Sequence, residues 1–477
     1  MYLNNLVLNS RIVILFLFLV LTVICPFQAQ AQEIEVGLEE CIRIALDHNN
    51  EIILAKEDQN IAKAKTVNAW SSVFPKINLS TGFNRTVSRQ GVLSFQKKLD
   101  AGSIPASASG LMDNFGFGEE MDIYSLKLTF QQLLFGMHAL PTMEAAKYGL
   151  ELANYNFLGK KLMVIYQTKE LYCNILKSEE LLKSAVENYN LVNKLINKTE
   201  EMVAAGLATQ IDLLRLKLQL KNIEQGVLGS KNNVKTTRAR LNLLIGKSVY
   251  TKLKLAPLQK NMNLPKEYID FNFLYKLALK NRPELKLLEK QAKLYEVQKV
   301  IISSPKYPSI FFNSSVGMMN YEPKFDYDKN SDWMVAVTGQ WNFYDGGDID
   351  SKVAETEATI RKINEQKDMH TRSIELELSL VINQIDLAVA KIETAQAEVS
   401  LAKQNHQLVY EKFLANTATN LEVIDSQASL SSAMINLINA QYDFQIIKAK
   451  LEYILGIANE TGENFFMDLL RNGDSAE

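Results

Sequence analysis

Two copies of one structural unit make up the chain, and this internal duplication constrains the fold more than any other feature. Residues 45–52 correspond to residues 278–285 at an offset of roughly 233 residues, and residues 207–212 correspond to residues 417–422 at an offset of roughly 210. The offset shrinks because the first half has the longer loop between residues 82 and 124. We therefore expect each half to contain, in order, a helix, a strand, a loop, a strand, a long helix, a short break and a second long helix.

Four segments alternate apolar and polar residues with the period of a β-strand. The alternation predicts strands at about 76–88, 123–135, 309–319 and 333–344. One apolar and one polar face over about ten residues suits a membrane-barrel strand with lipid on one side and water on the other. A soluble sheet with one face on a core shows the same alternation, so both interpretations remain open at this point.

Long helices follow the strands in each half. Apolar and small residues recur at alternating spacings of four and three, as in Val381, Ile385, Ala388 and Ile392. Such heptads are typical of coiled coils. The breaks near residues 206 and 416 are too short for anything but an antiparallel hairpin. We therefore predict coiled-coil hairpins over 141–246 and 348–456, with an outgoing first helix on the order of 95 Å long.

Four strands are too few to close a membrane barrel, which usually needs at least about eight. After residue 31 no apolar run reaches the roughly 18 residues that a membrane-spanning helix requires. If this chain enters a membrane, it must therefore do so through strands of a closed barrel, and several chains must share that barrel.

The first 31 residues have the features of a secretory signal peptide. Arg11 precedes an apolar run over residues 12–21, and Ala29-Gln30-Ala31 is typical of a cleavage site. Two alternatives remain open, an uncleaved membrane anchor and a lipoprotein acylated at Cys25. We expect an exported chain whose mature form retains two widely separated cysteines and no disulfide framework.

The charge balance argues against nucleic acid as a partner. The chain has 52 Lys and Arg residues against 54 Asp and Glu residues, so a basic footprint is missing. Its four histidines are scattered without metal-ligand spacing, and no nucleophile–base pair or carboxylate constellation stands out. We therefore expect no enzyme activity, no metal site and no cofactor.

Three local motifs resemble those of the TolC-like outer-membrane efflux protein family. Pro75 and Pro308 each open a strand after a helix. Phe343-Tyr344-Asp345-Gly346-Gly347 is similar to the family's aromatic-Asp-Gly-Gly turn, whereas the first half has Phe135-Gly136-Met137 instead. The segment 205–213 is similar to the family's hairpin tip. The resemblance covers essentially the whole mature chain.

This resemblance implies a mainly α fold with membrane β-strands. Four strands per chain would contribute to a trimeric twelve-stranded outer-membrane β-barrel, continued through the periplasm by a long antiparallel coiled-coil α-barrel. The expected division is a signal peptide at 1–31, a first repeat at 32–250, an equatorial connector at 251–271, a second repeat at 272–457 and a tail at 458–477.

The resemblance also implies two functional regions. The hairpin tips would dock a periplasmic adaptor joined to an inner-membrane pump, through Gly206, Leu207, Ala208, Thr209, Asn416, Thr417, Ala418 and Thr419. Glu422 and Asp425, three residues apart on one helical face, would form an acidic ring at the periplasmic entrance. Both sets have plainer explanations, namely hairpin geometry for the tips and a favourable helix-dipole interaction for the acids.

The resemblance thus implies a passive exit duct of a tripartite efflux or type I secretion system, located in the outer membrane with a long periplasmic part. The alternative hypothesis is a periplasmic coiled-coil scaffold whose sheet packs internally and forms no channel. The sequence leaves the cargo open.

Overall fold

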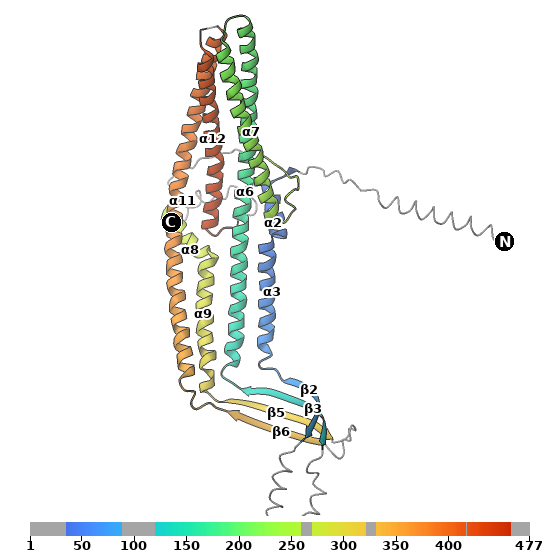
Figure 1. Ribbon diagram of the computed structural model, residues 1–477. Helices are drawn as coiled ribbons and strands as arrows, with labels where there is room; N and C mark the ends of the chain where they lie inside the picture. The colour runs from blue at the N-terminus through green and yellow to red at the C-terminus, as the bar shows by residue number, and fades with distance from the viewer. Residues whose placement is uncertain (1–34, 88–119, 259–269, 321–330, 416, 459–477) are drawn as a thin grey trace, which may run out of the picture.

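The computed structural model describes residues 35–87, 120–258, 270–320, 331–415 and 417–458. They form a long helical column with a four-stranded sheet at one end and two helix-hairpin tips at the other (Figure 1). The signal peptide and nearly all of the tail lie outside the described residues, as do residues 259–269 of the expected connector.

The two halves follow the same order of elements. The first half contains β1 (Glu35–Val36), α2 (Leu38–His48), α3 (Asn50–Trp70), β2 (Lys76–Val87), β3 (Glu120–Phe135), α6 (Ala139–Ala204) and α7 (Gln210–Leu244). The second half contains β4 (Lys254–Leu255), α8 (Phe271–Asn281), α9 (Pro283–Ser303), the 3-10 turn η2 (Ser304–Lys306), β5 (Ser309–Asn320), β6 (Ser331–Gln340), α11 (Asp348–Leu414) and α12 (Asn420–Ile454).

The sheet has the antiparallel order β2-β3-β5-β6, so β2 and β6 are its edges. Its register places large apolar residues of all four strands on one face, while Ile123, Phe311, Met319 and Met334 lie on the other. One apolar row runs across the sheet through Leu79, Leu128, Val316 and Trp333. Leu79 and Trp333 at the ends of this row are 70% and 79% exposed. The apolar face of the single chain is therefore uncovered at both edges, as expected of a surface that meets lipid.

The predicted heptad seams are the packing surfaces of the long helices. On α11 the seam residues Val381, Ile385, Ala388 and Ile392 are buried, and the equivalent positions on α6, α7 and α12 are buried or half-buried. Near the tips the helices pack in the order α11-α12-α6-α7, and toward the sheet in the order α11-α9-α6-α3. As a result, α11 is one edge of this helical layer along its whole length, and α7 and α3 form the other edge.

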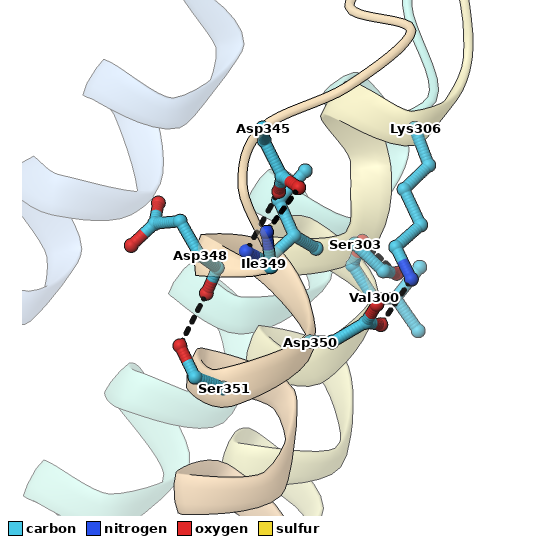
Figure 2. Close-up of polar contacts among 9 residues, drawn as sticks. Val300, Ser303, Lys306, Asp345, Asp348, Ile349, Asp350 and Ser351 are labelled. Carbon is cyan, nitrogen blue, oxygen red and sulfur yellow. Dashed lines mark hydrogen bonds and ion pairs between the residues drawn. The ribbon is translucent and has the colours of Figure 1, made fainter.

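An aspartate and two glycines turn the chain from the sheet into α11. Figure 2 shows Asp345 hydrogen-bonded at the start of this helix. Gly346 and Gly347 have φ values of 70° and 89°, which other L-residues rarely adopt. The Asp345 carboxylate accepts hydrogen bonds from the backbone N–H groups of Gly347 at 3.0 Å and Ile349 at 2.8 Å. These bonds lower the pKa of Asp345. Strand β6 spans Ser331–Gln340 rather than the predicted 333–344, and the turn capped by Asp345 leads the chain into α11 at Asp348.

In the middle of the column, the two long hairpins end in equivalent ways, each at a glycine packed closely against another backbone segment. Gly246 follows α7 and Gly456 follows α12, with φ values of 69° each. A Cβ on Gly246 would clash with the His48 carbonyl oxygen, and one on Gly456 would lie 2.9 Å from the Asn281 carbonyl carbon. Each long hairpin therefore ends against the junction between the two short helices of its own half.

Candidate functional site

The first hairpin tip is built from standard helix-capping interactions. Gly206 follows α6 with a φ of 73°, its N–H donates to the Val203 carbonyl at 3.0 Å, and the Leu207 N–H donates to the Met202 carbonyl at 2.8 Å. These two bonds form a Schellman motif, which satisfies the last carbonyls of a helix. Thr209 and Asp212 then form a capping box at the start of α7. The three residues that specify this reversal of the chain are Gly206, Thr209 and Asp212, which lie within seven residues of sequence.

The second tip repeats this arrangement. The Thr417 N–H donates to the Lys412 carbonyl at 2.9 Å, the counterpart of the bond made by Leu207. Thr419 and Glu422 form the capping box of α12. Since both tips use the same capping positions, the duplication extends to individual hydrogen bonds.

The residues predicted to dock an adaptor lie together at the end of the column. Gly206, Leu207 and Thr209 are exposed, with Leu207 63% exposed, and Ala208 is half-buried. In the second tip, Thr417 and Thr419 are exposed and Ala418 packs against the core of the tip. Asn416 lies outside the described residues. Leu207 is thus a large apolar side chain held at the end of the molecule by rigid capping.

Glu422 and Asp425 share an exposed face of α12 but have different surroundings. The Glu422 carboxylate accepts hydrogen bonds from the Thr419 N–H at 2.7 Å and the Thr419 hydroxyl at 3.0 Å. These bonds lower the pKa of Glu422. Among the described residues, no ion pair includes Asp425. Capping therefore holds Glu422, whereas Asp425 faces solvent.

A second apolar stripe on α11 was not predicted from the sequence. Leu380, Leu387, Leu401 and Leu408 are spaced by seven residues or its multiple and are all exposed, with Leu401 67% exposed. They lie off the buried seam of the same helix. The seven-residue spacing is visible in the sequence, and it is a signal for a second coiled-coil contact.

The opposite edge of the helical layer also exposes apolar residues. Near the tip, α7 presents Ile211, Leu214 and Leu218, and toward the sheet α3 presents Leu54 and Ile61. Both helix edges of the single chain are thus apolar. Exposed apolar surface at both edges is typical of an assembly interface.

Within the described residues, no helix combines the length and apolar character needed to cross a membrane.

A family comparison agrees with this architecture. The sequence profile of the family described as "Outer membrane efflux protein" matches residues 41–247 and 274–457, which are most of the chain and fall in the two halves. The chain belongs to this family. It is an outer-membrane efflux channel, and the predicted fold class, location and role as an exit duct are confirmed.

Two relatives match about three quarters of the chain, and two solved structures match about nine tenths of it. The chain is 20% identical to outer membrane protein TolC of Escherichia coli, covering 76% of this chain and 75% of that protein. It is 20% identical to alkaline protease secretion protein AprF of Pseudomonas aeruginosa, covering 73% and 72%. The Campylobacter jejuni CmeC outer membrane channel superposes with a TM-score of 0.73 at 15% identity, covering 92% and 90%. VceC of Vibrio cholerae gives a TM-score of 0.71 at 17% identity, covering 88% and 96%. The structural matches support the fold.

Proposed function

We propose that three copies of this chain form one continuous duct, with a shared twelve-stranded barrel and a twelve-helix tube. Two copies would give eight strands, and an eight-stranded barrel is just wide enough for its own side chains to fill. Three copies are the smallest number that leaves a channel. Twelve helices about 10 Å apart would form a ring about 38 Å across between helix axes.

The observation that carries this proposal is the pair of apolar edges on one chain. The leucine stripe of α11 lies at one edge of the helical layer, and the exposed residues of α7 and α3 lie at the other. A contact between unlike surfaces generates a ring when its rotation closes. The sheet can close in the same way, because an even number of alternating strands lets β6 of one copy pair antiparallel with β2 of the next.

The duct would act passively at the outer end of an efflux or type I secretion machine. We infer that the tips dock a periplasmic adaptor joined to an inner-membrane pump, with Leu207 and its neighbours as the contact surface. Three copies of Asp425, supported by Glu422, would line the periplasmic entrance and favour cations. The chain itself would perform no chemistry, because the pump supplies the energy.

The scaffold alternative requires the sheet to pack its apolar face internally. The exposure of Leu79 and Trp333 argues against that arrangement. A soluble protein with this face open would be prone to association.

Reconstitution in planar lipid bilayers tests the proposal. The purified protein should insert from detergent and give uniform single-channel steps in KCl. Protein that stays monomeric in aqueous buffer without detergent, and gives no steps at any voltage, would contradict a channel and favour the scaffold.

A further inference from the structure

The polar face of the sheet contains one row with two opposite charges. Ser80 of β2 pairs with Lys127 of β3, Lys127 pairs with Gly317 of β5, and Gly317 pairs with Asp332 of β6. This row lies next to the apolar row described above, on the other face of the sheet. Lys127 and Asp332 are therefore at the same level of the sheet, two strands apart.

Gly317 lies between the two charged residues in this row and has no side chain of its own to separate them. A Cβ on Gly317 would lie 3.4 Å from Cγ and 3.5 Å from Cβ of Lys127, so the stem of the lysine occupies the room above the glycine. Two strand spacings amount to about 10 Å. No side chain of the row stands between Lys127 and Asp332, and both of these residues are exposed.

Charge is sparse on the polar face. Among the described residues of this face, Lys127 and Asp332 are charged, and so is Lys76 at the helix end of β2. The other described residues on this face are uncharged, and the two neighbouring rows contain Ser125 and Ser315 as well as Met319 and Met334. The field inside the barrel at this level would therefore come mainly from Lys127 and Asp332.

We propose that Lys127 and Asp332 form a charged collar in the bore that sets the charge selectivity of the barrel. This inference rests on the proposed three-chain barrel. Three copies would alternate three ammonium groups and three carboxylates around the bore. The ammonium groups repel cations and the carboxylates repel anions, so their contributions offset each other. A variant that lacks one kind of charge should therefore show the ion selectivity that the other kind produces.

Reversal potentials of the full-length protein in bilayers under a KCl gradient test the collar. Lys127→Gln should raise the cation-to-anion permeability ratio by about twofold or more, and Asp332→Asn should lower it by a similar factor. The double variant should return close to the wild-type ratio. Ser80→Asn changes the same row without changing its charge, and it should leave the ratio unchanged.

Lys127→Cys provides a second route if the neutral variants insert poorly. The native Cys41 and Cys173 are buried, so a water-soluble aminoethyl thiol reagent would modify residue 127 selectively and restore a positive charge there. The ratio should rise on substitution and fall back on modification. Conducting channels that keep the wild-type ratio in all these variants would overturn the collar and leave the duct intact. Absence of conductance from the wild-type protein would overturn the duct, and the collar with it.

Discussion

At the residue scale, the two acidic candidates near the second tip differ in what holds them. The Glu422 carboxylate is bound by Thr419, whereas Asp425 is open to solvent. Because the pKa of Glu422 lies below its ordinary 4.5, its contribution to the cap is present at neutral pH. That contribution is lost as the pH falls through the lowered pKa. The protection of the first turn of α12 against hydrogen exchange, relative to the intrinsic exchange rate at each pH, should therefore fall only in acid. The sequence placed both acids on one face, but it could not show that one of them is engaged in capping.

We expect Asp425→Asn to lower the cation preference of the channel more than Glu422→Gln does. The Asp425 carboxylate is exposed to solvent, while loss of Glu422 mainly weakens the cap. Reversal potentials of the two variants measure the difference, and Asp212→Asn in the first tip is the matched control for capping alone. An unchanged reversal potential in Asp425→Asn would remove the acidic ring from the account.

The glycines at the middle of the column give a stability prediction. Gly246→Ala and Gly456→Ala should each destabilise the fold by about 1–3 kcal/mol, because a Cβ meets backbone there and φ is positive. Gly226→Ala, inside α7 with open space around it, should be neutral or stabilise by up to about 1 kcal/mol. Thermal unfolding in detergent compares the three. Equal melting temperatures for all of them would show that the close approaches are not needed.

At the element scale, α11 shows which contacts of a long helix a heptad pattern can predict. The alternating four-and-three spacing predicted the buried seam through Val381 and Ile385. The second stripe through Leu401 and Leu408 shows the same seven-residue period, yet a single sequence does not say what covers it.

Strand faces were predictable from alternation, but strand ends were not. The alternation continues past Gln340, while capping by Asp345 starts α11 soon afterwards.

Charges in the second stripe should prevent assembly without unfolding the chain. Leu401→Lys combined with Leu408→Lys leaves the buried seam intact but places two ammonium groups in the proposed contact between copies. Size-exclusion chromatography in detergent should show smaller particles with wild-type helical content. Val186→Lys, at an exposed position of the central helix α6, is the control. If the double variant elutes with the wild-type protein, this stripe is not the contact.

At the scale of the whole molecule, the duplication explains most of what could be predicted. It implies two equal sets of strands and hairpins, and the shared capping of the tips follows from it. The count of four strands per chain was enough to predict a shared barrel. The pairing of Lys127, Gly317 and Asp332 in one row could not be predicted, since cross-strand register depends on loops and bulges rather than on alternation alone.

The central claim is that neighbouring copies complete one cylinder through unlike edges. Native mass spectrometry of the detergent-solubilised protein tests it most directly, because it counts the chains in each particle. We predict a single species of three chains, lost when Leu401 and Leu408 are both replaced by lysine. A uniform population of monomers or dimers that still conducts ions would contradict the account.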